Sequence, residues 1–235
     1  MSSSETIVAI KDLEFRWVPD GLPVLAFEHL HITRGERVFI KGASGSGKST
    51  LLSLLGGVIT PQRGSVEVLG ESLHTLGGAG RDRFRADHIG FVFQMFNLLP
   101  YLSTIDNVIL PCRFSRRRRE RALSRDANLE TAALRLLDHL DLADPAALAR
   151  PVTELSVGQQ QRVAVARALI GAPELVVADE PTSALDWDRR EAFLQLLERE
   201  CEEQGITLIF VSHDPSLEPL FDRTVALAEL NRNCH

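Results

Sequence analysis

The chain has 235 residues, of which 44% are hydrophobic and 25% are charged, and its formal net charge is -6 at pH 7. This length suits one well-cored domain with a small inserted lobe, and the composition is that of a globular rather than a disordered or fibrous protein. The acidic balance disfavours a protein that coats nucleic acid, and no apolar run approaches the roughly 18 to 20 residues that span a bilayer.

The N-terminal residues show no basic stretch followed by an apolar core and a cleavage site, so we expect no secretory signal and a cytosolic location. The three cysteines, Cys112, Cys201 and Cys234, are widely spaced and form no C-x-x-C pair. This pattern favours reduced thiols over a disulfide framework or a zinc site.

The first forty residues alternate short β-type runs with turn signals. Runs at 6–10, 13–17 and 27–32 predict antiparallel strands at the edge of a sheet. Residues 37–41 (RVFIK) are typical of a buried strand, which leads into a glycine-rich loop and a helix beginning near Lys48.

The glycine-rich loop carries a specific chemical signal. Residues 42–49 (GASGSGKS) match the G-x-x-x-x-G-K-[ST] pattern, in which backbone N–H groups turn inward around phosphate oxygens. Lys48 adds a positive charge, the helix adds its N-terminal dipole, and the Ser49 hydroxyl can bind magnesium. The alternative, a glycine turn that only opens a helix, is disfavoured because the whole pattern matches after a strand.

A further strand-like run, residues 89–93, is followed by Gln94 and by an apolar stretch at 95–100. This stretch has two interpretations. About half of its residues suit the protein core, and the alternative is a surface groove that receives a short helix of a partner protein.

Residues from about 101 to 157 change in character and predict an inserted helical subdomain. Apolar residues recur at helical spacing between Leu129 and Leu140. The basic run at 116–119 is interpreted as a solvated helix face, with contact to lipid head groups as the alternative.

Residues 155–162 (LSVGQQQR), here called the LSVGQ segment, lead into an alanine-rich helix expected over residues 159–170. The Ser156 hydroxyl and the exposed N–H groups near Gly158 form a helix end that can receive an anion. The plain alternative is a capped helix with no further role.

After the LSVGQ segment the chain alternates between strands and helices. We expect strands at 174–178, 206–211 and around 224–227, and a helix at 188–201, a spacing that favours a parallel central sheet.

Candidate catalytic groups follow two of these strands. Asp179 and Glu180 come after the first, where an open parallel sheet presents its ligands, although acids at such a place also begin ordinary turns. His213 comes after the second, and taken alone a histidine beside a helix start is more often a packing or capping group.

The phosphate loop, Gln94, the LSVGQ segment, the acidic pair and His213 occur in the order found in the ATP-binding subunits of ABC transporters, which the chain resembles over nearly its whole length. The resemblance implies an α/β fold of the P-loop NTPase type, with a parallel core sheet, an antiparallel N-terminal β subdomain and an inserted helical subdomain. One such domain would occupy residues 1–235. Residues 89–111 look closest to the lipoprotein-releasing and macrolide-exporting branch.

The resemblance also implies ATP and Mg²⁺ as cofactors, bound by two copies that close head to tail. Glu180 would orient or deprotonate the attacking water, His213 and Lys48 would contact the outer phosphates, and Gln94 would sense magnesium and water. Magnesium is expected at Ser49, Gln94 and Asp179. The nucleotide is expected at Trp17, Gly42, Ala43, Ser44, Gly45, Ser46, Gly47, Lys48, Ser49, Thr50, Gln94, Asp179 and His213, with Ser156, Gly158, Gln159 and Asp186 acting across the dimer interface.

Two positions need comment. Trp17 is aligned to stack on adenine, with Phe15 as its rival, because an aromatic face suits adenine without a hydrogen-bond pattern. Val157 stands where the common LSGGQ form has its first glycine. Its β-branched side chain narrows the allowed backbone angles, so we expect altered closure kinetics rather than lost activity.

The sequence therefore predicts an ATPase that acts as a homodimer at the cytoplasmic face of the inner membrane and contacts the membrane through a separate permease, without a nucleic-acid partner. The permease would export or extract a lipid-like, peptide or drug-like substrate. The alternative is an ATP-driven mechanical switch that controls an extracytoplasmic enzyme without transport. A DNA-repair or translation ATPase is disfavoured, because long heptad repeats and a second cassette are absent from the sequence.

Overall fold

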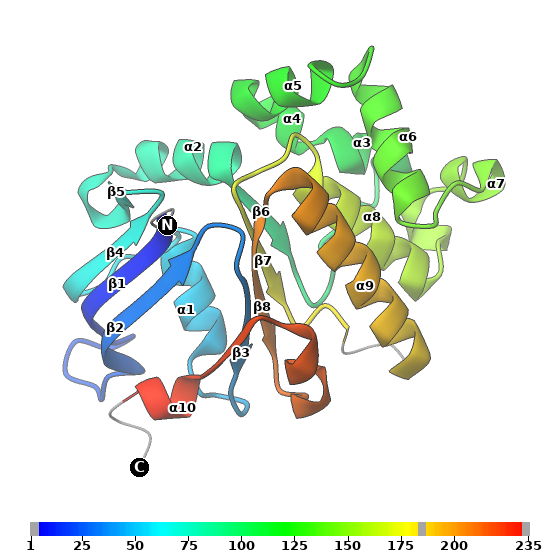
Figure 1. The fold of residues 1–235 in the computed structure, drawn as a ribbon. Coiled ribbons are helices and arrows are strands. Elements are labelled where there is room, and N and C mark those ends of the chain that lie inside the picture. Colours follow the sequence, from blue (N-terminus) through cyan, green and yellow to red (C-terminus); the bar gives the residue numbers. More distant parts are fainter. Residues whose placement is uncertain (1–4, 183–186, 232–235) are drawn as a thin grey trace. The chain divides into compact units, whose positions relative to one another are not determined.

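The computed structural model describes residues 5–182 and 187–231 (Figure 1). The chain divides into two compact units. The first comprises Met1–Arg85 and Thr207–His235, and the second comprises Ala86–Ile206.

An antiparallel sheet forms one layer of the first unit. Its strands, in the spatial order β2-β1-β4-β5, are β1 (Thr6–Phe15), β2 (Leu25–Thr33), β4 (Arg63–Val68) and β5 (Glu71–Ser72). The antiparallel strands expected near the N-terminus are confirmed, but the two runs at 6–10 and 13–17 form one strand. Asp12, at φ 48°, lies where the pairing of β1 with β4 shifts register, so a local irregularity replaces the expected break.

The first unit also contains three parallel strands. β3 (Arg37–Lys41) lies between β8 (Thr207–Ser212) and β9 (Arg223–Ala226) and pairs with both. Strands covered on both faces have continuous apolar sequences, and Phe39 and Phe210 at their centre are fully buried and stacked, with ring centroids 6.2 Å apart. The first unit also contains the helical elements α1 (Lys48–Leu55), η1 (Leu73–Thr75), η3 (Pro215–Leu220) and α10 (Leu227–Leu230). Helix α2 (Gly78–His88) begins in this unit and ends in the second.

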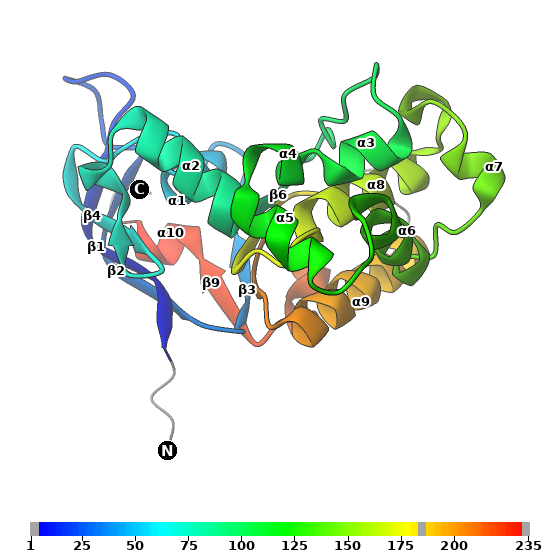
Figure 2. The ribbon, with the colours of Figure 1, turned by 90° about the horizontal axis from the view of Figure 1, so that it is seen from above.

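The second unit has a parallel strand pair and most of the helices. β6 (Ile89–Val92) pairs with β7 (Leu175–Asp179). The helical elements are α3 (Thr104–Ile109), α4 (Pro111–Phe114), α5 (Arg116–Leu123), α6 (Leu129–His139), α7 (Pro145–Leu148), η2 (Val152–Glu154), α8 (Val157–Leu169) and α9 (Trp187–Gln204). Figure 2 shows α3 to α7 gathered beside α8. No helix in the described ranges is long and apolar enough to cross a membrane.

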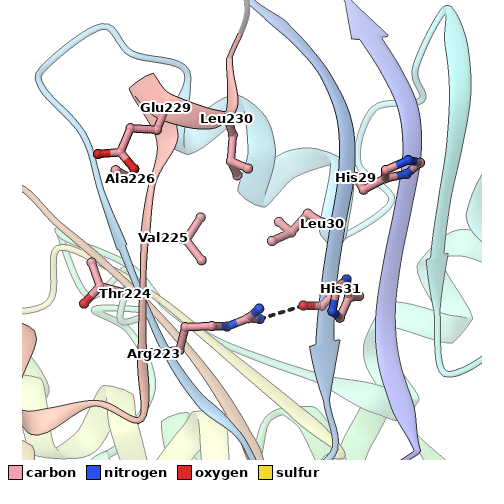
Figure 3. A pocket seen from close by; sticks show the side chains of 9 residues that line it. All are labelled: His29, Leu30, His31, Arg223, Thr224, Val225, Ala226, Glu229 and Leu230. Carbon is pink, nitrogen blue, oxygen red and sulfur yellow. Dashed lines mark hydrogen bonds between the residues drawn. The ribbon is translucent and has the colours of Figure 1, made fainter.

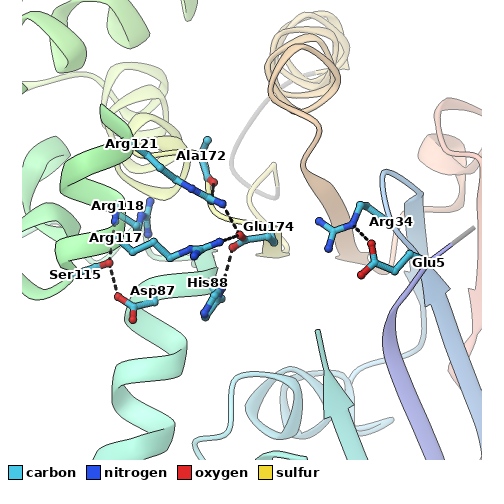
Figure 4. A network of polar contacts seen from close by, with 10 residues as sticks. All are labelled: Glu5, Arg34, Asp87, His88, Ser115, Arg117, Arg118, Arg121, Ala172 and Glu174. Carbon is cyan, nitrogen blue, oxygen red and sulfur yellow. Dashed lines mark hydrogen bonds and ion pairs between the residues drawn. The ribbon is translucent and has the colours of Figure 1, made fainter. Parts of the chain in front are cut away.

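The basic run on α5 anchors this helix to the rest of the second unit (Figure 4). Arg118 is only 2% exposed, and its guanidinium donates to the carbonyl oxygens of Ala168 and Ile170 at 2.6 and 2.7 Å, at the C-terminal end of α8. Burial lowers the pKa of Arg118 to about 10, so the group stays charged at neutral pH. The interpretation of the run as a solvated helix face is therefore wrong for this arginine, because the last carbonyls of α8 need a donor.

Candidate functional site

In the first unit, the glycine-rich loop and the segment of His213 leave the same edge of the parallel strands. Lys41, the last residue of β3, pairs in register with Ser212, the last residue of β8. Since the two strands are parallel, the loop at 42–47 and the segment that begins at His213 both start at their carboxyl edge, where open α/β sheets bind ligands.

Neighbouring side chains approach two glycines of the loop closely. Gly47, which precedes the first residue of α1, has φ 96°, and a Cβ atom there would lie 2.8 Å from Leu25 Cδ2. A Cβ atom on Gly42 would lie 2.4 Å from Ser46 Oγ. Gly47 therefore supports a curled backbone whose N–H groups can face an anion, whereas a side chain at Gly42 would displace the Ser46 hydroxyl.

Lys48 and Ser46 give this loop the character of an anion site. Lys48 is 8% exposed, and its ammonium group donates to the carbonyl oxygens of Gly42 and Ala43 at 2.8 and 3.0 Å. The Ser46 hydroxyl is buried and has no hydrogen-bond partner among the residues that the structure describes. A polyphosphate would place negative charge beside the Lys48 ammonium and offer an acceptor oxygen to the Ser46 hydroxyl, so the residues fit the triphosphate of ATP.

Trp17 and His213 are both exposed in the first unit. Trp17 is 61% exposed and meets the ring of Phe15 edge to face at 5.0 Å, whereas Phe15 is buried in the core. Of the two aromatics, only Trp17 offers a ring face to a ligand. Asp214, the residue after His213, accepts a hydrogen bond from the Ser216 backbone N–H at 3.0 Å and caps η3. This cap fixes the segment that carries the histidine.

In the second unit, Gln94 and the acidic pair follow neighbouring parallel strands. Val92 of β6 pairs with Ala178 of β7, so Gln94 and Asp179 lie at the same edge. Glu180 has φ 44°, a left-handed backbone conformation that is uncommon outside glycine and is frequent at functional sites.

The N-terminal end of α8 carries the LSVGQ segment. Ser156 Oγ accepts from the Gln159 backbone at 3.3 Å, and the Ser156 backbone donates to Gln159 Oε1 at 2.9 Å, which is a complete capping box. The helix begins at Val157, two residues earlier than expected. Val157 is therefore helical, a conformation open to valine, and a Cβ atom on Gly158 would meet no atom within 4 Å.

Two contacts of α8 were not foreseen from the sequence. Gln161, on the buried side of the helix, donates from Nε2 to the carbonyl oxygen of Pro181 at 2.9 Å. Arg167 donates to the carbonyl oxygens of Phe96 and Asn97, the latter at 2.7 Å, and burial lowers its pKa. A polar side chain at a core position of a helix is the only sequence signal for such contacts.

The predicted interface residue Asp186 lies outside the described residues, as does Ser183. Pro181 and Thr182, the last described residues before Ser183, are buried.

A pocket in the first unit and a cluster of possible metal-ligand residues in the second contain none of the predicted site residues. A pocket of about 260 Å³ opens between β2, β9 and α10 (Figure 3), where Arg223 donates to the His31 carbonyl at 2.6 Å. His139, Glu200 and Glu203 bring ligand-type atoms within 4.8 Å of one another. His139 Nδ1 and Oε1 of the buried Glu200 lie within hydrogen-bond distance at 2.8 Å, which accounts for the proximity of these two residues without a metal ion.

Comparison with known proteins identifies the family. The model of the family described as ABC transporter matches residues 28–183. The chain belongs to the ABC transporter family. It is 42% identical over 206 residues to the lipoprotein-releasing system ATP-binding protein LolD of Syntrophotalea carbinolica, covering 88% of this chain and 87% of LolD. It is also 39% identical to the macrolide export ATP-binding/permease protein MacB of Rhodopirellula baltica, covering 92% of this chain but 31% of MacB.

Solved structures of ABC cassettes share the fold. The dimeric structure of the bacterial ABC transporter cassette MJ0796 superposes with a TM-score of 0.77 at 35% identity and covers 94% of both chains. A second dimeric structure of MJ0796, in a post-hydrolysis state with ADP and Pi, matches equally well. This ABC protein is an ATP-binding ATPase, as the sequence predicted, and the expected P-loop fold is confirmed.

Proposed function

We propose that this ABC ATPase works as a head-to-tail homodimer that drives a separate integral membrane permease, which exports or extracts a lipid-like, peptide or drug-like substrate. The exposed N-terminal end of α8 carries this proposal, because a capped helix end with open space at Gly158 is suited to an anion brought by another molecule. The dimeric state of MJ0796 and the names LolD and MacB support it.

We assign the triphosphate of ATP to the glycine-rich loop. Lys48 would exchange its two carbonyl partners for phosphate oxygens, and the Ser46 hydroxyl would gain an acceptor. Trp17 offers its exposed ring to adenine. Ser49, Gln94 and Asp179 are the residues that would hold Mg²⁺, which would supply charge neutralisation at the phosphates.

Hydrolysis requires a group that accepts a proton from water or orients it. We assign this role to Glu180, whose left-handed backbone indicates a position fixed for function, and the contact with the γ-phosphate to His213. From the second copy, Ser156, Gly158, Gln159 and the N–H groups of α8 would complete the site, with Asp186 at the interface.

We place the permease contact at the apolar stretch after Gln94, which would hold the ATPase at the cytoplasmic face of the inner membrane. Both earlier interpretations of residues 95–100 find support within it. Phe96 is buried, with 7% of its surface exposed, whereas Met95 is 80% exposed. Tyr101, the residue after this stretch, is 78% exposed. Exposed apolar side chains next to a buried one suit a docked helix.

The test is hydrolysis and transport by the Glu180→Gln variant reconstituted with the permease in vesicles. The amide keeps the shape of the carboxylate but cannot accept the proton, so ATP binding should persist while turnover falls by at least about a hundredfold. Wild-type vesicles should displace substrate on ATP addition. Retained turnover would remove Glu180 from the catalytic role.

The alternative function is a mechanical switch that controls an extracytoplasmic enzyme without transport. The same vesicles separate the two. ATP-dependent activation of an attached hydrolase with no displaced substrate would favour the switch and contradict the pump.

A further inference from the structure

The side chain of Gln161 connects two segments to which the proposed function gives separate roles. It lies little more than one turn after Ser156, on the inner side of α8, and is 1% exposed. Its Nε2 group donates to the carbonyl oxygen of Pro181 at 2.9 Å. Pro181 directly follows Glu180 in the chain, so one buried hydrogen bond joins the helix of the LSVGQ segment to the backbone beside the candidate catalytic carboxylate.

The backbone at Glu180 needs such support. Glu180 has φ 44°, and a left-handed conformation is unfavourable for a residue other than glycine, so it persists only where the surrounding structure holds it. Pro181 has no N–H group, so its carbonyl is the only backbone hydrogen-bonding group that can tie it to a neighbour. The amide of Gln161 satisfies that carbonyl in a buried place, where an unpaired acceptor is unfavourable.

A second side chain of α8 makes a similar contact. Arg167 donates to the carbonyl oxygens of Phe96 and Asn97, which have φ 58° and 48° and follow Gln94. The helix thus holds left-handed backbone beside two of the candidate site residues. Gln161 is the contact nearer to the end of α8 that carries Ser156.

We propose that Gln161 is a positioning residue for ATP hydrolysis: its amide fixes the Pro181 carbonyl and thereby aligns Glu180 with the LSVGQ end of α8. The inference rests on the proposed role of Glu180. In a head-to-tail dimer, α8 contacts the nucleotide of one site and Glu180 acts at the other. The hydrogen bond from Gln161 therefore couples the contact of α8 with one nucleotide to hydrolysis of the second nucleotide. Gln161 acts through the backbone and touches no substrate.

The primary test is the steady-state kinetics of Gln161→Met. Methionine has a similar length and lacks the N–H donor, so Glu180 loses its alignment while the nucleotide loop is unchanged. We expect kcat to fall on the order of tenfold with the KM for ATP within about twofold, because the lost interaction serves the transition state rather than binding. Gln195→Met, the same change at an exposed position of α9, should leave both values unaltered.

A second variant tests the hydrogen bond itself and remains informative if Gln161→Met unfolds. In Gln161→Glu the ionised carboxylate cannot donate to the Pro181 carbonyl, whereas the protonated acid can. Burial raises the pKa of a carboxyl group, so the protonated fraction grows as the pH falls. The kcat of this variant relative to wild type should therefore rise as the pH is lowered from about 8 to about 6.

The outcomes separate this inference from the proposed function. If wild type hydrolyses ATP and Glu180→Gln does not, the role of Glu180 stands. Under those conditions, an unchanged kcat in Gln161→Met, or a higher KM with unchanged kcat, would overturn the inference. A Gln161→Glu variant with wild-type kcat at every pH would do the same. If Glu180→Gln retains full turnover, the proposed function fails first.

Discussion

At the scale of single residues, Lys48 shows why the glycine-rich loop suits an anionic ligand. Its ammonium group is nearly buried and lies against two carbonyl oxygens of its own loop. Carbonyl dipoles compensate a buried charge less well than anionic oxygens do. A polyphosphate therefore offers Lys48 better partners than the loop itself.

Lys48→Ala should weaken ATP binding by about ten- to a hundredfold, the range expected for one charge-assisted hydrogen-bonding group. Titration with a fluorescent ATP analogue measures this affinity directly. Lys11→Ala, at an exposed position of β1, is the control and should bind as wild type does. An unaltered affinity for Lys48→Ala would contradict the assignment of the phosphates to this loop.

At the scale of elements, α5 is fixed to the helix and strand that carry the candidate site. Arg118 binds the C-terminal end of α8, and Arg117 and Arg121 form ion pairs at 2.5 and 2.7 Å with Glu174, just before β7 (Figure 4). His88 contacts the other oxygen of Glu174 at 2.9 Å. Burial alone raises the pKa of Glu174, but these hydrogen bonds outweigh it and hold the pKa well below its usual value.

This lowered pKa predicts a pH dependence of stability. The ionised carboxylate stabilises the folded state above the unfolded-state pKa of about 4.3, and that contribution is lost as the pH falls below it. Glu174→Gln should therefore be less stable near neutral pH and lose less stability than wild type between about pH 5 and about pH 3. Denaturant unfolding across this range measures both.

The matched control is Glu120→Gln, which removes the carboxylate that pairs with Arg116 on the exposed side of α5. A screened surface pair contributes little, so its stability should follow that of wild type at each pH. Parallel stability curves for wild type and Glu174→Gln would show that the ion pairs at Glu174 do not stabilise the fold.

The elements that the sequence predicted well are those with a strong local pattern. The strands β3, β7 and β8 are continuous apolar runs because both faces are buried, and the glycine loop is defined by its own residues. The sequence also placed Gln94 and the acidic pair after strands. Their roles remain predictions.

The contacts that could not be predicted depend on distant partners. The helix α2 has no buried residue and no apolar stripe, and is fixed by Arg81 and Arg85, which donate to carbonyls at Gly57 and Gly56 after α1. Arg118 and Gln161 likewise look like ordinary polar residues until the chain folds. Their acceptors lie 20 or more residues away, where no local periodicity points to them.

At the scale of the whole molecule, the proposed activity depends on the assembly of two copies. The cassette fold supplies a phosphate loop in one unit and the LSVGQ segment in the other, and the dimeric MJ0796 structures show that related cassettes associate. In the proposed dimer, the exposed end of α8 is the part of this chain that would meet the second copy, and no atom lies within 4 Å of a Cβ atom built on Gly158.

The most direct measurement is the molar mass of Glu180→Gln in solution, by light scattering, with and without saturating ATP and Mg²⁺. Blocked hydrolysis should trap the closed state, so we predict the mass of a dimer with ATP and of a monomer without nucleotide. Wild type with ADP should also be monomeric. If Glu180→Gln binds ATP yet remains a monomer, even with the permease supplied, the head-to-tail dimer is contradicted.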